Sequence, residues 1–496
     1  MNLTSEQQRI VSSTESIIVV SAFAGAGKSS TLRAYAEAHP TWSFLYLCYN
    51  KSAQEDAQKK SPKNVTCKTI HSLAYAAVGF KYRHKFGNNR VRDVMNSLNI
   101  PKEKITHIKH CLNIISEWCN SAELLLQGYI DKYYKSDLDG AATVGETSAT
   151  IWNAMQDVTN NDVQMTHDGY LKLYHQSAPL LSYDGVMLDE AQDSNPITVA
   201  ILECIQCSHK IICGDVHQSI YSFRGARNAI ADFAKLTPEV LYLTSTFRFN
   251  QVVADYATSI LSGLKGETNK IIGAGDKGRV STYSSAEIQS LPKYTTIIGR
   301  RNASLFSVAI ECLIKGKKVY FSDGLDRYDL SMILDVANLE CWEGTPTHPL
   351  IKQFTRFYEL ETYVEESEEA DVSFAVQLVK KYGGRKLKTY ITKLREEEVY
   401  IKGDFYNRIK EVEYQLTTAH RSKGLEYKVV ALLDDFQEII QMVNNEWHKD
   451  YSNGVLQGQD LEDYTQEVNL LYVAATRGKE ALYMPYNINS ALKSVL

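Results

Sequence analysis

The sequence predicts an α/β protein with two domains, each a parallel sheet flanked by helices and interrupted by a mainly helical segment. Three observations support this prediction. Short β-branched runs alternate with helix-forming segments in two separate regions of the chain. A glycine-rich turn connects the first such run to a helical segment. Residues 80–165 and 325–410 instead mix polar and apolar residues at helical spacing.

The first domain begins with a strand, a turn, a helix and a second strand. Residues 17–22 read IIVVSA and residues 43–49 read SFLYLCY, and each run predicts a strand. Further strands are predicted at residues 185–188, 210–213 and 240–243. We therefore assign residues 1–79 and 166–243 to this domain and residues 80–165 to a helical insertion.

The second domain repeats the alternation of strands and helices. Its predicted strands are residues 295–299, 318–321 and 428–433. We assign residues 244–324 and 411–496 to this domain and residues 325–410 to a second helical insertion. That insertion contains seven carboxylates between Glu359 and Asp371. Such a run is typical of a solvated helix face, and the alternative is a surface for a protein partner.

The composition is that of a globular protein. Hydrophobic residues are 44% and charged residues 23% of the 496 residues, which excludes disorder and repeat arrays. A membrane-spanning helix needs about 18 consecutive apolar residues, and no stretch of the sequence comes near this length. The N-terminus lacks the basic-then-apolar layout of a signal peptide. The scattered cysteines favour reduced thiols. We therefore expect a cytoplasmic protein, with a nucleoid-associated or a virus-encoded protein as alternatives. We also expect a monomer.

A phosphate-binding loop is predicted in the first glycine-rich turn. Residues 22–29 read AFAGAGKS and fit the P-loop pattern, with Ala22 in the place of the usual first glycine. The Lys28 ammonium is expected to reach the β- and γ-phosphates of ATP, and the Ser29 hydroxyl to bind Mg²⁺. The remaining residues expected to surround the phosphates are Ala24, Gly25, Ala26, Gly27 and Ser30.

The acidic half of a nucleotide hydrolase site is predicted after a later strand. Residues 186–193 read VMLDEAQD, in which the apolar run is the strand. Asp189, at the end of the strand, is placed to hold Mg²⁺. Glu190 beside it is suited to orient and deprotonate the attacking water.

With these motifs in place, the sequence resembles the UvrD/Rep-type superfamily 1 DNA helicases. Further segments match the motifs of this family in the family's order: residues 3–7 (LTSEQ), 49–53 (YNKSA), 69–72 (TIHS), 214–226 (GDVHQSIYSFRGA), 246–248 (TFR), 418–427 (TAHRSKGLEY) and 471–478 (LYVAATRG). Residues 67–75 are most similar to the F-box DNA helicase branch. No F-box segment is expected here, since the first motif begins at Leu3.

The resemblance implies two RecA-like domains with ATP in the cleft between them. It places Gln218, Arg248 and Arg477 on the γ-phosphate, where the planar arginine fork pairs well with phosphate oxygens. It places the Phe247 ring against adenine. Two further residues are expected to contact the nucleoside, Gln7 at adenine and Glu426 at the ribose.

The resemblance also implies a track for single-stranded DNA across both domains. Positions that match the track are His71, Tyr221, Phe223, Arg224, Arg300, Asn302, Thr418 and His420. Tyr49 and Asn50 belong to the track too, although Cys48 stands where many relatives have a stacking phenylalanine, so we expect Tyr49 to replace it. The net charge of −5 does not oppose this, because a local groove determines binding.

The function implied is an ATP- and Mg²⁺-dependent DNA helicase that moves 3′ to 5′ on single strands and opens ss/dsDNA junctions in replication, repair or recombination. One alternative is a translocase that displaces proteins from single strands with little unwinding, since both insertions are short for the family. A second is a motor directed by RNA. A third, a nucleotide-gated binding module without turnover, disagrees with the intact set of catalytic residues.

Overall fold

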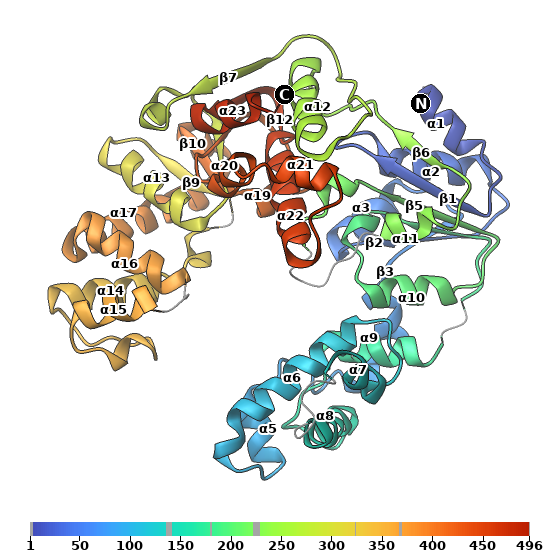
Figure 1. The fold of residues 1–496 in the computed structure, drawn as a ribbon, viewed down its shortest axis with the longest axis horizontal. Coiled ribbons are helices and arrows are strands. Elements are labelled where there is room, and N and C mark those ends of the chain that lie inside the picture. The colour runs from blue at the N-terminus through green and yellow to red at the C-terminus, as the bar shows by residue number, and fades with distance from the viewer. Residues whose placement is uncertain are drawn as a thin grey trace. The chain divides into compact units, whose positions relative to one another are not determined.

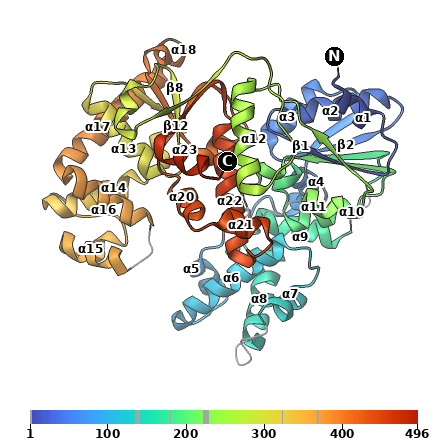
Figure 2. The same cartoon turned by 45° about the horizontal axis from the view of Figure 1, so that its top comes forward.

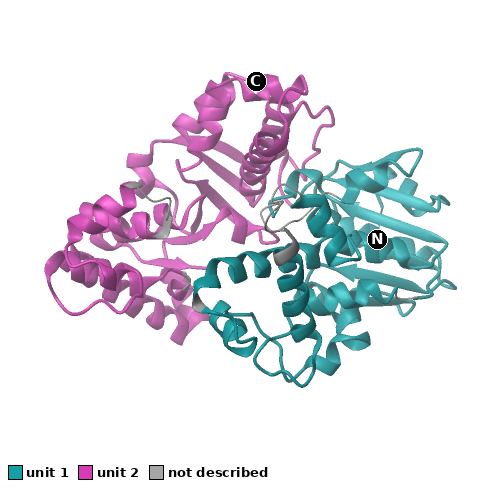
Figure 3. Cartoon of the chain, turned by 60° about the horizontal axis from the view of Figure 1, so that its bottom comes forward, with its two compact units in different colours: residues 1–246 teal, residues 247–496 magenta. Residues whose placement is uncertain are grey.

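A computed structural model describes residues 3–134, 141–178, 181–221, 229–322, 324–366 and 370–495. The chain forms two compact units, residues 1–246 (unit 1) and residues 247–496 (unit 2), which Figure 3 distinguishes by colour. Each unit contains one parallel sheet with helices around it, so the predicted fold class is confirmed. Among the described residues, no helix is both long enough and apolar enough to span a membrane.

The sheet of unit 1 has the strand order β3-β2-β4-β5-β1-β6, and all of its pairings are parallel (Figure 1). Its strands are β1 (Ile17–Ala22), β2 (Phe44–Cys48), β3 (Val65–Thr69), β4 (Gly185–Leu188), β5 (His209–Gly214) and β6 (Val240–Leu243). Every residue of β2 and β4 is buried, as expected for central strands covered on both faces. β2 and β4 were predictable because their apolar runs are short and uninterrupted.

Helices of unit 1 connect and cover these strands. The described α-helices are α1 (Ser5–Val11), α2 (Lys28–Ala38), α3 (Lys51–Lys60), α4 (Ile70–Ala77), α5 (Val91–Ser97), α6 (Ile105–Asn120), α7 (Leu126–Tyr133), α8 (Ala141–Gln156), α9 (His167–Gln176), α10 (Pro196–Cys204) and α11 (Ala229–Ala234). Helices α5 to α8 lie together, with α6 packed on its three neighbours (Figure 2). They share a hydrophobic core that includes Trp118 and Trp152 and continues into Tyr170 of α9 and Ile197 of α10.

The sheet of unit 2 has the strand order β7-β12-β11-β8-β10-β9, again with parallel pairings. Its strands are β7 (Arg279–Tyr283), β8 (Thr295–Gly299), β9 (Val319–Phe321), β10 (Tyr414–Thr418), β11 (Tyr427–Leu432) and β12 (Gly478–Pro485). The described α-helices are α12 (Gln251–Lys265), α13 (Asn302–Ile314), α14 (Leu330–Cys341), α15 (Phe357–Glu366), α16 (Ala370–Tyr382), α17 (Gly384–Gly403), α18 (Phe405–Arg408), α19 (Ala419–Ser422), α20 (Gln437–Asn444), α21 (Trp447–Ser452), α22 (Gly458–Ala475) and α23 (Tyr486–Lys493).

Four strands are additions to the sequence prediction: β3, β7, β10 and β12. Each carries polar residues among its apolar ones, as in VTCKT for β3 and YQLTT for β10. Such segments resemble loops until they pair with a neighbour. β3 and β7 are also edge strands, which are only half covered and tolerate polar side chains.

Candidate functional site

The P-loop of unit 1 lies between the end of β1 and the start of α2. Gly25 and Gly27 have φ angles of 74° and 78°, a left-handed conformation that glycine adopts without strain. Gly27 is also the N-cap residue of α2, and it has no side chain with which to bond the first N–H groups of the helix. These donors, together with the positive end of the helix dipole, form a site for a phosphate.

Two hydrogen bonds fix the conformation of the loop. The Ala26 N–H donates to the Phe23 carbonyl over 3.1 Å, and the Thr246 hydroxyl donates to the Ala24 carbonyl over 2.7 Å. Ser30 lies in the first turn of α2. The loop residues predicted from the sequence therefore form one continuous turn at the C-terminal end of β1.

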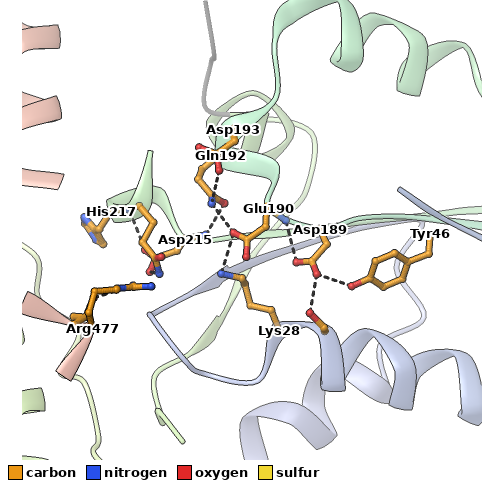
Figure 4. A network of polar contacts seen from close by, with 12 residues as sticks. Lys28, Tyr46, Asp189, Glu190, Gln192, Asp193, Asp215, His217 and Arg477 are labelled. Carbon is orange, nitrogen blue, oxygen red and sulfur yellow. Dashed lines mark hydrogen bonds and ion pairs between the residues drawn. The ribbon is translucent and has the colours of Figure 1, made fainter. Parts of the chain in front are cut away.

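The ammonium of Lys28 pairs with the acid after β4 (Figure 4). Its Nζ atom lies 3.2 Å from Oε2 of Glu190. Burial disfavours the charged form of Lys28, but the carboxylates of Glu190, Asp215 and Asp189 together raise its pKa above the ordinary value. The lysine therefore stays charged in a buried position, as a phosphate-binding lysine must.

Two hydroxyl groups donate hydrogen bonds to one carboxylate oxygen of Asp189, beside this ion pair. The Ser29 hydroxyl donates to Oδ2 of Asp189 over 2.8 Å, and the Tyr46 hydroxyl donates to the same oxygen over 2.5 Å. Burial and the neighbouring Glu190 raise the pKa of Asp189. A hydroxyl next to a half-buried carboxylate is a donor set that fits Mg²⁺, and the cation would offset the crowding of negative charge.

Tyr46 is a member of this site that the sequence analysis missed. It lies within β2, where every residue is buried, so its sequence context is that of any core tyrosine. Only the pairing of β2 with β4 brings its hydroxyl to Asp189. No local signal in the sequence distinguishes it.

A chain of side-chain amides and carboxylates extends from Glu190 (Figure 4). Nε2 of Gln192 donates to Oε2 of Glu190 over 2.6 Å, and Oε1 of Gln192 accepts from the Asp215 N–H over 2.9 Å. Nε2 of Gln218 donates to Oδ2 of Asp215 over 2.6 Å. The structure thus links Gln218 to Glu190 through Gln192 and Asp215, for which the sequence analysis predicted no role.

Backbone geometry in this network leaves little freedom. Glu190 has φ 52° and ψ 43°, a left-handed conformation that costs a non-glycine residue about 1 kcal/mol or more. A Cβ atom at Gly214 would lie 2.3 Å from Oε1 of Gln192. The turn therefore holds Glu190 in a strained position and requires glycine at the end of β5.

Gln7 lies at the start of α1 and is bonded inside unit 1. Its Oε1 accepts from the Thr4 N–H over 3.0 Å, and its Nε2 donates to the Thr31 hydroxyl over 3.0 Å. Thr31 belongs to α2, the helix that follows the P-loop. The amide is thus fixed in orientation and attached to the helix that follows the P-loop.

Unit 2 contains the remaining predicted nucleotide residues. The Phe247 ring is 59% exposed, as an unpartnered stacking surface would be. Nε of Arg248 lies 3.5 Å from Oε2 of Glu426, and Nζ of Lys479 lies 2.6 Å from Oε1 of the same residue. Hydrogen bonding to Lys479 and the charge of Arg248 lower the pKa of Glu426.

Arg477 follows the C-terminal end of α22. Its guanidinium donates to the carbonyls of Val473 over 2.8 Å and Leu425 over 3.3 Å, and to the Thr476 hydroxyl over 3.1 Å. These bonds orient the side chain within unit 2.

The predicted nucleic-acid residues of unit 1 include a stacked aromatic pair. The rings of Tyr49 and Tyr221 lie nearly parallel, 6.2 Å apart with an interplanar angle of 9°. Tyr49 is 49% exposed, whereas Cys48 is buried. Asn50 is the N-cap of α3 and accepts from the Ala53 N–H over 2.8 Å.

His71 lies in the first turn of α4, with its ring edge-on to the Tyr170 ring at 5.9 Å. Burial lowers the pKa of His71, so it is neutral near pH 7. Two predicted track residues, Phe223 and Arg224, lie outside the described residues.

The predicted track residues of unit 2 lie in different local settings: an ion pair, a helix cap and the first residue of a helix. Arg300 forms a bidentate ion pair with Glu467, with N–O distances of 2.6 Å to 3.1 Å. Thr418 caps α19, which contains His420, by accepting from a backbone N–H. Asn302 is the first residue of α13. The charge of Arg300 is therefore already balanced within the unit.

Comparison with known proteins identifies related families over most of the chain. The model of the UvrD/REP helicase N-terminal domain matches residues 3–235, and that of the UvrD-like helicase C-terminal domain matches residues 347–489. F-box DNA helicase 1 of Gallus gallus is 31% identical over 99% of this chain and 50% of its own length. F-box DNA helicase protein 1 of Schizosaccharomyces pombe is 29% identical over 97% of this chain and 57% of its own.

More distant similarity extends to bacteria. ATP-dependent DNA helicase PcrA of Leuconostoc citreum is 24% identical over 58% of this chain and 43% of its own length. The chain thus spans about half the length of the F-box relatives that it matches. The resemblance to the F-box branch is confirmed by these two relatives.

Proposed function

The chain belongs to the UvrD-like family of DNA helicases, and we propose that it is an ATP-driven motor that moves along single-stranded DNA and opens duplex junctions. The observation that best supports this proposal is the joint placement of Lys28, Ser29, Asp189 and Glu190. The hydrogen bond from Ser29 to Asp189, of 2.8 Å, and the ion pair of Lys28 with Glu190, of 3.2 Å, connect the P-loop to the acidic turn.

We assign these residues the following roles. Lys28 and the N–H groups at the start of α2 bind the phosphates, and Ser29 and Asp189 hold the Mg²⁺ that accompanies the nucleotide. When bound, the cation neutralises charge that develops on the phosphate oxygens. Glu190 orients the attacking water and accepts its proton. Gln192 keeps the Glu190 carboxylate in position by its 2.6 Å hydrogen bond.

The γ-phosphate is assigned to Gln218, Arg248 and Arg477, and the nucleoside to Gln7, Phe247 and Glu426. The family motifs that contain these residues support the assignment. Two of the three γ-phosphate residues are arginines, which form bidentate bonds with phosphate oxygens. The exposure of the Phe247 ring supports its role in stacking on adenine.

The nucleic-acid track is assigned to the residues predicted from the motifs. The pair formed by the exposed Tyr49 ring and the half-buried Tyr221 ring supports this assignment, because parallel rings offer stacking surfaces to unpaired bases. Many relatives have a base-stacking phenylalanine at the position of Cys48. We assign that stacking role to Tyr49 in this chain. His71, neutral and partly buried, suits contact with a sugar or base. To bind a DNA phosphate, the Arg300 guanidinium would have to give up its ion pair with Glu467.

Further parts of the proposal concern organisation and direction. We retain the division into two motor domains with insertions at residues 80–165 and 325–410, a monomer as the active form, 3′-to-5′ movement and a protein partner at the second insertion. Family resemblance supports the direction.

Strand-displacement assays test the proposal. A duplex with a 3′ single-stranded tail should be unwound in the presence of ATP and Mg²⁺, and a duplex with a 5′ tail should not. Streptavidin displacement without unwinding would instead indicate a translocase that removes proteins. Activity on RNA tails alone would indicate an RNA-directed motor, and unwinding from 5′ tails alone would overturn the direction.

A further inference from the structure

Exposed aromatic rings continue beyond His71 in unit 1. His71 and Tyr75 are four residues apart in α4 and therefore lie on one face of the helix. Phe80 follows in the short helix η1 (Gly79–Tyr82), with its ring edge-on to Tyr75 at 6.2 Å. The side chains of Tyr75 and Phe80 are 36% and 55% exposed. Large apolar rings in a row on the surface call for an explanation other than core packing.

The Tyr75 ring is held in place from within the unit. It packs against the rings of Phe86 at 5.9 Å and Tyr170 at 6.2 Å, and α4 packs along α9, which contains Tyr170. A ring with fixed neighbours loses little conformational entropy when a ligand stacks on it. Tyr75 is therefore a rigid surface and not a loosely attached side chain.

The segment of the chain that contains these rings is basic. Residues 57–92 contain nine Lys and Arg and no Asp or Glu, in a chain whose net charge is −5. The Arg83 guanidinium lies 4.3 Å from the centre of the Phe80 ring, and both Lys81 and Arg83 are exposed. Lys85 is the exception, since its buried ammonium donates to the carbonyls of Ala154 and Asp157. Cations beside exposed rings are the pattern that binds single-stranded nucleic acid.

We propose that Tyr75, Phe80, Lys81 and Arg83 form a further binding site for single-stranded DNA, in which bases stack on the two rings and phosphates pair with the two cations. This site continues the track past His71, and the inference rests on the proposed function. Single strands fit it better than duplex, because only unpaired bases offer their faces to a ring. This stacking role explains why the rings of Tyr75 and Phe80 are exposed in unit 1.

Photocrosslinking locates the contact directly. An oligo-dT that carries iododeoxyuridine is irradiated with the full chain and digested with trypsin. The peptide of residues 69–81, bounded by Lys68 and Lys81, contains both rings and should carry the crosslink. Fragmentation of this peptide should place the adduct on Tyr75 or Phe80. Adducts elsewhere in the chain, with none on this peptide, would overturn the proposal.

Binding of fluorescent oligo-dT measures the contribution of the rings. The double variant Tyr75→Ala/Phe80→Ala should bind at least about fivefold more weakly than wild type. The variant Tyr75→Phe/Phe80→Tyr keeps both rings and should bind like wild type, which separates stacking from folding. Tyr406→Ala removes a ring that is 86% exposed in unit 2 and serves as the matched control.

Salt dependence tests the two cations separately. Lys81→Gln/Arg83→Gln should reduce the slope of log affinity against log salt by about 0.7 for each phosphate contact that is lost. Equal affinity and slope in all variants, while wild type binds oligo-dT, would overturn this site and leave the proposed function intact. Wild type that does not bind oligo-dT at all would overturn the proposed function itself.

Discussion

The Nζ atom of Lys28 lies 3.2 Å from a carboxylate oxygen of Glu190, although the two residues come from distant segments of the chain. Lys28 begins the helix after the P-loop, and Glu190 follows β4. Phosphates that bind Lys28 compete with Glu190 for its charge. The arrival of ATP should therefore weaken the ion pair and release Glu190 for its proposed role as the base that deprotonates the attacking water.

The first prediction concerns Glu190 as the base. Glu190→Gln should lower kcat for ATP hydrolysis by about 100-fold or more, because the amide cannot accept the proton of the water. ATP binding, measured with a fluorescent nucleotide, should persist. Glu203→Gln, which changes an exposed carboxylate of the same unit, should leave kcat unchanged. Hydrolysis at the normal rate by Glu190→Gln would exclude this residue as the base.

The second prediction concerns Tyr46, which the sequence analysis missed. Tyr46→Phe removes the 2.5 Å hydrogen bond to Asp189 and should raise the Mg²⁺ concentration for half-maximal ATPase activity several-fold. Tyr35→Phe, a buried tyrosine of α2 with only a 3.5 Å contact to a carbonyl, is the matched control. An unchanged Mg²⁺ titration in Tyr46→Phe would show that the hydroxyl does not position Asp189.

The third prediction concerns the arginine assigned to the γ-phosphate. Arg477→Ala should lower kcat by about 1,000-fold while ADP still binds, because the contact that we propose for the guanidinium is with charge that develops in the transition state. Arg395→Ala removes an exposed arginine of the same unit and should have no effect. If Arg477→Ala instead lowers the affinity for ADP as strongly as kcat, the arginine has a general structural role.

The fourth prediction concerns pH and the stability of unit 1. Burial, with the nearby Lys172, lowers the pKa of His175 to about 4. The unfolded chain therefore binds a proton at His175 between about pH 6.5 and pH 4 that the folded chain does not bind, so stability falls as the pH falls through this range. The urea midpoint should drop between pH 7 and pH 5.

His175→Gln removes the titrating group and should flatten this drop in the urea midpoint. His84→Gln changes an exposed histidine of the same unit and should leave the drop unchanged. A wild-type midpoint that is equal at both pH values would contradict the prediction.

The sequence predicted the parts of the site that local patterns determine. The strand of residues 17–22, the glycine-rich turn and the helix from Lys28 are adjacent in the chain, and the fold class follows from such units. Asp189 was predictable because it ends an apolar run. The prediction of these residues required no knowledge of tertiary contacts.

Residues whose role depends on tertiary pairing were not predictable. Tyr46 reaches Asp189 only because β2 pairs with β4, and Gln192 reaches Asp215 only because β4 pairs with β5. The ion pair of Arg300 with Glu467 likewise joins segments that are distant in sequence. Strands with mixed polarity, such as β10, are recognisable only once their neighbours are known.

The most direct test of the proposed motor is steady-state ATPase activity with and without poly-dT at low salt. We expect strong stimulation by poly-dT in the wild-type chain and its loss in Lys28→Ala, because the proposed motor couples the P-loop to the single strand. A rate that neither DNA nor RNA changes would contradict it, and would instead indicate a nucleotide-gated switch without a nucleic-acid track.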